Sequence, residues 1–180
     1  MRMKVGVLAV QGAFAEMEAY WRKKGADAFE IRQCADLKRG MDMLALPGGE
    51  STVQGKLLKD LGLFDPLKER IDGGLPVFAT CAGLILLAKK IEGDPMVWFG
   101  SLPVVVRRNA YGRQLGSFRT VGTFDGKPNV PMTFIRAPAI TEVSSEVEVL
   151  STFDDAPTSV RWRNITAFTW HPELENIPSF

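Results

Sequence analysis

Three residues of the chain could together carry out nucleophilic acyl transfer. The single histidine among the 180 residues, His171, lies 90 positions after Cys81 and two positions before Glu173. A cysteine can act as nucleophile and a histidine as its base, while a carboxylate can fix the imidazole tautomer and stabilise the imidazolium. Cys81, His171 and Glu173 therefore predict a cysteine-dependent site, provided that folding brings them together.

The residues around Cys81 predict a strand, a tight turn and a helix. The apolar stretch 75–78 leads to small residues on both sides of Cys81, and an Ala-, Leu- and Lys-rich stretch continues to Lys90. In such a turn the central side chain points out at the carboxyl end of the strand, and the N–H of the next residue, here Ala82, points to the same space. The alternative is a small buried core cysteine, which the small neighbours disfavour.

His171 follows the apolar, β-prone stretch 165–170, so we expect it where a late strand ends and the chain turns at Pro172. Glu173 is close enough in sequence to reach the same imidazole. The alternative is a surface or core histidine without a catalytic role. The position after a strand and the neighbouring carboxylate favour catalysis.

A loop with two glycines is the next chemical candidate. Residues 47–52, Pro-Gly-Gly-Glu-Ser-Thr, follow the third predicted strand. Gly48 and Gly49 allow a close approach to a ligand and leave an N–H free to donate to an oxyanion. The alternative is an ordinary turn before a helix capped by Ser51 or Thr52. The glycine spacing excludes a phosphate-binding loop, and one histidine with two scattered cysteines predicts no metal site.

Composition excludes several other classes of protein. The chain is 46% hydrophobic, enough for a sizeable core, and its length predicts one domain over residues 1–180. Charge is nearly balanced, with 22 Lys and Arg against 21 Asp and Glu, so nothing suggests a nucleic-acid partner. The uncharged run around Cys81 spans 12 residues, too few for a membrane span. Two cysteines cannot form a disulfide scaffold, which predicts a cytoplasmic location.

The order of the predicted elements indicates the fold class. Strands alternate with helices in the first half, which implies β/α units and a largely parallel sheet. Short strands fill the second half, and several should pair antiparallel and extend the sheet. We therefore expect an α/β fold: a single-domain three-layer sandwich with a central, mostly parallel mixed sheet flanked by helices. The expected strands are 4–10, 28–31, 43–46, 75–78, 104–107, 117–124, 132–136, 147–153, 159–163 and 165–169, and the expected helices are 13–24, 53–60, 66–71 and the stretch from Cys81 to Lys90.

Several segments resemble a known family. Residues 47–52, Thr80-Cys-Ala-Gly-Leu84 and His171-Pro-Glu-Leu174 look like the three signatures of class I glutamine amidotransferases, in which a Cys, His and Glu triad hydrolyses glutamine. Other segments narrow the resemblance to the glutaminase subunits of pyridoxal 5′-phosphate synthase. These are Val10-Gln-Gly12, Arg108-Asn109 with Tyr111-Gly-Arg-Gln114 and Ser117-Phe118, and Phe134-Ile-Arg-Ala-Pro138. The segments run in matching order from residue 10 to residue 174, nearly the whole chain.

The resemblance implies a flavodoxin-like α/β fold and a role for each matching residue. Cys81 would be the nucleophile, His171 the general base and then acid, and Glu173 its orienting partner. Backbone N–H groups of Gly48 or Gly49 and of Ala82 would form the oxyanion hole. The glutamine pocket would be lined by Gly48, Gly49, Glu50, Arg108, Ile135 and Arg136, with the arginines complementing the substrate carboxylate.

The resemblance also implies a partner. The chain would hydrolyse L-glutamine to L-glutamate and ammonia in the cytoplasm, with no cofactor bound to this chain itself. Ammonia would pass to the synthase subunit of the complex for pyridoxal 5′-phosphate synthesis. Gln11 and Gly12 would lie in the interface, and docking would order the loop that carries the oxyanion hole. Met17 departs from the family, which has a histidine there, and the chain ends seven residues after Glu173, where the family continues into a helix.

Two alternatives remain open. The first is another amidotransferase subunit, or a stand-alone cysteine hydrolase on the same scaffold; the segments 108–118 and 134–138 argue against it. The second is a non-catalytic binding or regulatory module that keeps the fold. The presence of all three triad residues argues against that one.

Overall fold

The computed structural model describes residues 1–110 and 116–175. In chain order its elements are β1 (Lys4–Leu8), α1 (Phe14–Lys23), β2 (Asp27–Ile31), the 3₁₀ helix η1 (Cys34–Arg39), β3 (Met43–Leu46), α2 (Ser51–Asp60), α3 (Phe64–Asp72), β4 (Val77–Thr80), α4 (Ala82–Leu87), β5 (Ala88–Ile91), β6 (Leu102–Arg107), β7 (Ser117–Phe124), β8 (Lys127–Ile135), β9 (Ala139–Val143), β10 (Glu148–Phe153), β11 (Ala156–Trp162), β12 (Ile165–Phe168) and the 3₁₀ helix η2 (Pro172–Leu174).

A central sheet organises the molecule. Within the described residues it has seven strands in the order β10-β11-β12-β4-β3-β1-β2. Strands β2, β1, β3, β4 and β12 run parallel, and β11 and β10 add antiparallel at one edge. The expected α/β fold with a mostly parallel mixed sheet is confirmed. Because β4 and β12 are neighbouring parallel strands, the residues that follow them meet at one edge of the sheet.

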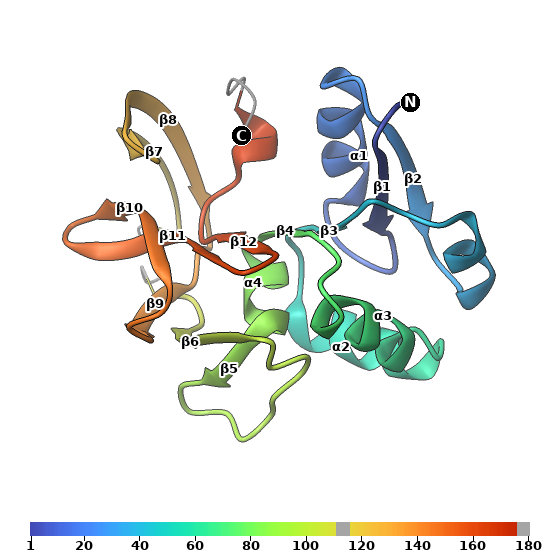
Figure 1. Cartoon of the computed structure of the whole chain (residues 1–180). Helices are drawn as coiled ribbons and strands as arrows, with labels where there is room; N and C mark the ends of the chain where they lie inside the picture. The colour runs from blue at the N-terminus through green and yellow to red at the C-terminus, as the bar shows by residue number, and fades with distance from the viewer. Residues whose placement is uncertain (111–115, 176–180) are drawn as a thin grey trace.

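Each face of the sheet has its own hydrophobic core. Along β3, Leu44 and Leu46 point into one core and Ala45 into the other, the alternation expected of a strand that is buried on both faces. Helices α2, α3 and α4, with β5 and β6, cover the first face. Helix α1 and the β7–β8 hairpin cover the second. Figure 1 shows α1 and the hairpin in the upper part of the molecule and α2, α3 and α4 in the lower part.

Aromatic rings fill the second core. Tyr20 and Trp21 of α1 pack on Phe78 of β4, and Phe78 in turn contacts Phe168 of β12. Met17, which stands where the resemblance implied a histidine, is fully buried in this core. Its side chain therefore packs α1 against the sheet.

Some strands differ from the sequence-based expectation. Residues 88–91 form β5 and not the end of a helix, because Ala88 and Lys90 pair with Leu102 and Val105 of β6. Strand β9 was not predicted, and it pairs with β6. In the described part of the chain, β5, β6 and β9 form a separate three-stranded sheet, and β7 and β8 a two-stranded one. The expectation that the late strands extend the central sheet therefore holds only for β10, β11 and β12.

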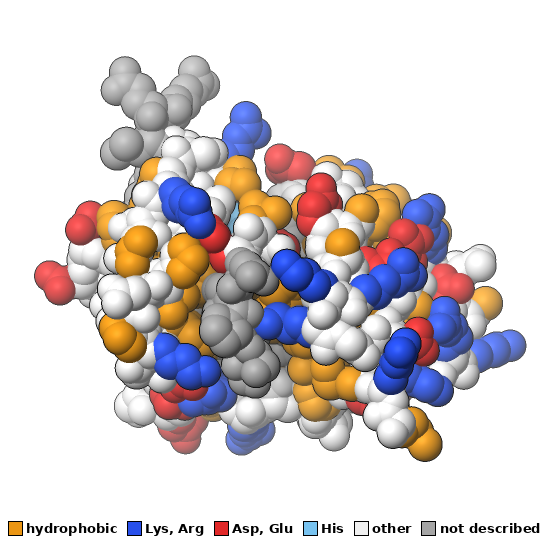
Figure 2. All heavy atoms as spheres, turned by 90° about the horizontal axis from the view of Figure 1, so that it is seen from above, with side chains coloured by type: hydrophobic (Ala, Val, Ile, Leu, Met, Phe, Trp, Pro, Cys, Tyr) orange, Lys and Arg blue, Asp and Glu red, His pale blue; other side chains and the backbone are white. Residues whose placement is uncertain are grey.

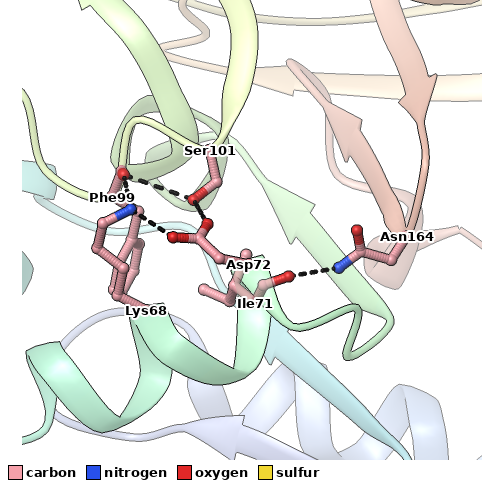
Figure 3. A network of polar contacts seen from close by, with 6 residues as sticks. All are labelled: Lys68, Ile71, Asp72, Phe99, Ser101 and Asn164. Carbon is pink, nitrogen blue, oxygen red and sulfur yellow. Dashed lines mark hydrogen bonds and ion pairs between the residues drawn. The ribbon is translucent and has the colours of Figure 1, made fainter.

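A polar network fastens α3 at the end of the sheet where β4 begins. Asp72 accepts hydrogen bonds from Lys68 Nζ at 2.7 Å and from Ser101 Oγ at 2.6 Å, and Lys68 also donates to the Phe99 carbonyl. Asn164, in the turn before β12, donates to the Ile71 carbonyl at 2.9 Å. Figure 3 shows these residues tying α3 to the segment before β6 and to the β11–β12 turn. The network steadies the register of β12 beside β4.

The surface carries charges of both signs. On the face seen in Figure 2, basic and acidic side chains lie interspersed, in keeping with a formal net charge of +1. Within the described residues no helix is both long and apolar enough to cross a membrane.

Candidate active site

Cys81 occupies a strained turn between β4 and α4. Its backbone has φ 50° and ψ −104°, a conformation that residues with a Cβ rarely adopt and that is typical of functional turns. The Cys81 N–H donates to the Phe168 carbonyl of β12 at 2.8 Å. Gly83 lets α4 lie against β3, because a Cβ at that position would lie 2.3 Å from the Leu46 carbonyl oxygen. The predicted strand, turn and helix are therefore present.

The sheet topology brings His171 to Cys81. Thr80 pairs with Phe168, so β4 and β12 end side by side, and Cys81 and His171 follow those ends. Gly48 borders both residues: a Cβ built on it would lie 2.6 Å from His171 Cε1 and 3.6 Å from Cys81 Cβ. The His171 N–H donates to the Thr133 carbonyl of β8 at 2.8 Å, which fixes the backbone there. The sulfur and the imidazole are thus neighbours.

Glu173 orients the imidazole. Its Oε1 lies 2.7 Å from His171 Nδ1 and accepts a hydrogen bond from Thr80 Oγ1 at 3.3 Å. Both His171 and Glu173 are buried. Glu173 Oε2 is also buried and has no hydrogen-bond partner within the described chain. Burial and the charge of Glu173 raise the pKa of the nearby Tyr20 hydroxyl above its ordinary value.

The electrostatics of the site favour a charged imidazole. Burial by itself lowers the pKa of His171, but hydrogen bonds to Cys81 and Glu173 and the charges of both partners raise it to about 10. The Glu173 carboxylate, 2.7 Å from Nδ1, stabilises the imidazolium. The arrangement suits a protonated His171 that can give its proton to a leaving group.

A residue that the sequence analysis did not identify, Glu175, holds the turn that carries Glu173. Glu175 is buried and accepts hydrogen bonds from Arg119 Nε and Nη2 of β7 at 3.1 and 2.8 Å, and from Thr133 Oγ1 of β8 at 2.5 Å. These bonds connect η2 to the β7–β8 hairpin. An acidic residue two positions after Glu173 gave no signal in the sequence, because its partners lie more than 40 residues away.

The loop with two glycines lies over the site. The Gly48 carbonyl accepts from the Ala13 N–H at 3.0 Å, and the Glu50 N–H donates to Gln11 Oε1 at 2.9 Å. In a trans peptide the carbonyl and the following N–H point in opposite directions, so the Gly49 N–H points away from the loop at 11–13. Helix α2 starts at Ser51 with Glu50 as its N-cap residue, and Glu50 makes no side-chain capping hydrogen bond, so the expected helix cap by Ser51 or Thr52 is wrong.

Gln11 and Gly12 pack directly on this loop. A Cβ at Gly12 would lie 2.1 Å from the Gly48 carbonyl oxygen, and one at Gly49 would lie 2.5 Å from Gln11 Oε1. Gln54, a fully buried residue of α2 that sequence reasoning did not single out, donates from Nε2 to the Gln11 carbonyl at 3.1 Å and to the Pro47 carbonyl at 3.3 Å. Gln11 and Gly12 therefore support the loop; their place in a partner interface stays a prediction.

A cavity of about 430 Å³ opens beside the triad. Of the predicted site residues, Ala82 and Gly12 do not line it: Ala82 is fully buried at the start of α4, where only its backbone N–H could serve the site. The predicted residues that line it are Gln11, Gly48, Gly49, Glu50, Cys81, Arg108, Ile135, Arg136, His171 and Glu173. The chain thus gathers all but two of them around one cavity.

The two predicted arginines differ in their surroundings. Arg108 pairs through Nη1 with Asp94 Oδ2 at 2.7 Å, while its Nε and Nη2 are buried and unpartnered within the described residues. Arg136 is exposed at the end of β8 and has a positive φ of 43°. Its neighbour Ile135 places a carbonyl oxygen 3.9 Å from Cys81 Sγ.

Two other expectations concern the rest of the site. In the described residues, no group of three or more His, Cys, Asp and Glu side chains could hold a metal ion. The segment Tyr111-Gly-Arg-Gln114, part of the resemblance, lies outside the described residues.

Residues 7–178 match the model of the SNO glutamine amidotransferase family. The chain is similar to a protein of Desulfitobacterium hafniense called pyridoxal 5′-phosphate synthase subunit PdxT, with 52% identity over 96% of this chain and 86% of the relative. A protein of Methanocorpusculum labreanum with the same name is 52% identical over 96% of this chain and 90% of the relative.

Solved structures agree on the fold. One described as a glutamine amidotransferase superposes with a TM-score of 0.89 at 41% identity, over 94% of this chain and 90% of that one. The structure of PurLQS from Thermotoga maritima shares the fold alone, with a TM-score of 0.71 at 11% identity over 96% of this chain and 89% of that one.

Proposed function

The chain belongs to the SNO glutamine amidotransferase family, and from this premise we propose that it is the glutaminase subunit of a pyridoxal 5′-phosphate synthase. It hydrolyses L-glutamine to L-glutamate and ammonia and delivers the ammonia to a synthase subunit. The relatives that are 52% identical over most of both chains carry the name of that subunit. We further propose that residues 1–180 act as one amidotransferase domain in the cytoplasm.

The observation that carries this proposal is the contact geometry of the triad. Cys81 lies in a strained turn, His171 lies against it at the end of the neighbouring parallel strand, and Glu173 Oε1 lies 2.7 Å from His171 Nδ1. Positive φ at a cysteine, a buried imidazole and a buried carboxylate each cost folding free energy, and features of this kind cluster at functional sites. Acyl transfer by a cysteine nucleophile uses a thiol beside a base that a third group orients, which is the arrangement of Cys81, His171 and Glu173.

The first half of the reaction forms a thioester. The Cys81 thiolate attacks the side-chain amide carbon of glutamine, and the carbonyl oxygen takes up the negative charge. Backbone N–H groups of Gly48 or Gly49 and of Ala82 donate to that oxyanion, each contributing roughly 3 to 4 kcal/mol to the transition state. His171 gives its proton to the departing nitrogen, so that ammonia leaves and a glutamyl thioester remains on Cys81.

The second half of the reaction restores the enzyme. His171, now neutral, removes a proton from a water molecule, which attacks the thioester carbon. The C–S bond breaks, glutamate leaves, and Cys81 returns to the thiolate. Glu173 stabilises the imidazolium in both halves and keeps Nε2 toward the sulfur.

Substrate recognition falls to the rest of the cavity. Arg108 presents unpartnered N–H groups that suit the α-carboxylate of glutamine, and Glu50 supplies a negative charge near the entrance that suits its α-ammonium group. Arg136 adds positive charge at the rim, and Ile135 contributes its backbone carbonyl. Gln11 and Gly12 support the loop with two glycines, residues 47–52, which carries part of the oxyanion hole. They also contact the synthase subunit, so that docking of the synthase can adjust the conformation of that loop.

Reconstitution tests the proposal. We expect glutamate release when the chain is mixed with glutamine and the synthase subunit of the same organism, and pyridoxal 5′-phosphate formation when pentose and triose phosphates are added. Cys81→Ala should lower kcat by roughly 10⁴-fold or more while the fold is retained. Glutamate release at an unchanged rate by that variant would exclude Cys81 as the nucleophile.

The same assays address the alternatives. A stand-alone hydrolase would reach full turnover without the synthase and would not support formation of the cofactor. A non-catalytic module would release no glutamate in either case. The buried pair of His171 and Glu173 beside Cys81 already favours an enzyme over a binding module.

A further inference from the structure

The guanidinium of Arg108 has two edges with different surroundings. Nη1 donates to Asp94 Oδ2 at 2.7 Å. Nε and Nη2, which point to the same side of the planar group, are buried and have no partner among the described residues. A carboxylate binds an arginine best through two parallel N–H···O bonds to one such edge. Arg108 therefore keeps a complete bidentate edge uncommitted while Asp94 occupies the remaining nitrogen.

The location of this edge connects it to the substrate. Arg108 lines the cavity that also contains Cys81 and His171, whereas Asp94 does not line it. Leaving two buried donors unpaired destabilises the empty site, and a ligand carboxylate would recover that free energy on binding. Glutamine, the substrate of the proposed function, offers one carboxylate at the end remote from its reactive amide.

Asp94 is itself fixed by its own turn. Its Oδ1 accepts a hydrogen bond from the Met96 N–H at 2.9 Å, and its backbone N–H donates to the Ile91 carbonyl at 3.3 Å. Gly93 before it adopts a positive φ of 72°, and Pro95 after it restricts the chain. The Met96 bond and then the Arg108 guanidinium lower the pKa of Asp94, in keeping with a permanent carboxylate. One oxygen thus secures the turn and the other holds Arg108.

We propose that Asp94 is a positioning residue that holds Nη1 of Arg108, so that the Nε–Nη2 edge of the guanidinium faces the α-carboxylate of glutamine. This inference rests on the proposed glutaminase function. Asp94 does not touch the substrate and acts only through Arg108. Without its carboxylate, the guanidinium gains rotational freedom and pays more entropy when it binds the substrate.

A neighbouring ion pair, which has no contact with the cavity, provides a comparison for the pair of Asp94 and Arg108. Glu92 pairs with Arg107 at 3.9 Å between the same two segments, and both side chains are more exposed than Asp94 and Arg108. Neither Glu92 nor Arg107 lines the cavity. Exposed pairs of this kind contribute little to stability. Glu92→Gln is therefore a matched control for Asp94→Asn.

Asp94→Asn isolates the contact to Arg108. The asparagine amide oxygen can still accept the Met96 N–H and preserve the turn, but its NH₂ group cannot accept from Nη1. The test compares kcat/KM for L-glutamine with kcat/KM for L-glutamine α-amide, which lacks the negative carboxylate. Both are measured by ammonia release with the synthase subunit in excess. We expect the variant to lower the ratio of kcat/KM for L-glutamine to kcat/KM for the α-amide roughly tenfold, mainly through a higher KM for glutamine. The reason is that Arg108 is oriented less well for its charge-assisted bonds to the α-carboxylate.

Two further variants complete the test. Glu92→Gln should leave the ratio unchanged. In an Arg108→Lys background, which already lacks the bidentate edge, Asp94→Asn should have no additional effect on the ratio. Thermal unfolding of each variant tests whether its fold is intact.

The outcomes separate the two proposals. If wild-type protein with its synthase subunit releases no ammonia from glutamine, the proposed function itself fails and this inference with it. A second outcome is that the wild type is active and Asp94→Asn lowers kcat/KM equally for both substrates, or for neither. The glutaminase function then stands, and the positioning role of Asp94 is wrong. An additive effect of Asp94→Asn in the Arg108→Lys background would also overturn it.

Discussion

A methyl group added at Gly48 should disable the triad while the fold persists. A Cβ at this position would lie 2.6 Å from His171 Cε1 and 3.6 Å from Cys81 Cβ. The backbone conformation of Gly48 is not in the left-handed region, so alanine fits the main chain without strain. Gly48→Ala therefore introduces a single steric conflict, and that conflict is with the imidazole.

The size of the conflict sets the expected loss. Ordinary van der Waals contact at a Cβ begins near 3.4 Å, so the imidazole or the loop must move by most of an ångström. The imidazole is held by Glu173 and its backbone by Thr133, and the loop is held by Ala13. A displacement of about 1 Å between reacting groups lowers turnover roughly 100-fold. We expect kcat to fall by about that factor, with a small change in Tm.

The assay measures kcat and KM for glutamine with the synthase subunit present, together with Tm by circular dichroism. Gly74→Ala provides the control, because Gly74 lies at the far end of β4, has a φ of 101° and has nothing within 4 Å of an added Cβ. That variant should lose about 1 kcal/mol of stability through backbone strain and keep its kcat.

The reasoning would be refuted by a Gly48→Ala enzyme that keeps kcat within twofold of wild type. A large fall in Tm that accompanies the loss of turnover would also contradict it, because the defect would then be in folding and not in the placement of His171.

Two further predictions concern the triad and its turn. Glu173→Gln keeps an amide oxygen that can accept from Nδ1 but removes the negative charge that helps to raise the pKa of His171 to about 10, so the alkaline limb of kcat against pH should move to lower pH. A raised histidine pKa stabilises the fold below the ordinary value of 6.5 and ceases to do so as pH rises through about 10. The stability lost by Glu173→Gln, measured by urea unfolding, should therefore be larger at pH 6 than at pH 10; a constant difference would count against the pairing. Gly83→Ala would bring a Cβ within 2.3 Å of the Leu46 carbonyl oxygen, and it should destabilise the protein by about 3 kcal/mol. Unchanged urea denaturation of that variant would show that α4 can move away from β3.

Local pattern predicted much of the fold correctly. The β/α alternation of the first half gave β1, α1, β2, β3 and the turn at Cys81 to within a few residues. These elements are determined by short-range signals, namely apolar periodicity, glycines and the small residues at the turn. The prediction that residues 88–90 continue the helix was wrong, because these residues belong to β5. Alanine and lysine favour a helix, but pairing with β6 outweighs that preference.

The candidate site, like the fold, was predicted only in part from the sequence. Cys81, His171 and Glu173 were identified from residue type and from resemblance to a family, as were the glycines of the loop. Glu175, Gln54 and Asp94 were not, although each makes hydrogen bonds to residues that carry or support the site. An acidic or amide side chain in a turn or helix has no distinctive spacing, and its meaning comes only from its partner.

The sequence by itself determined which reactive side chains the protein contains and which local turns present them, because local turns depend on residues that are neighbours along the chain. The tertiary structure decided which of these groups meet. Strand β12 lies beside β4, so that His171 reaches Cys81 across 90 positions, and β7 and β8 form a separate hairpin that holds the turn after Glu173. Strand pairing joins segments that are distant in sequence, and the apolar pattern of a strand specifies that it is buried without specifying its neighbour.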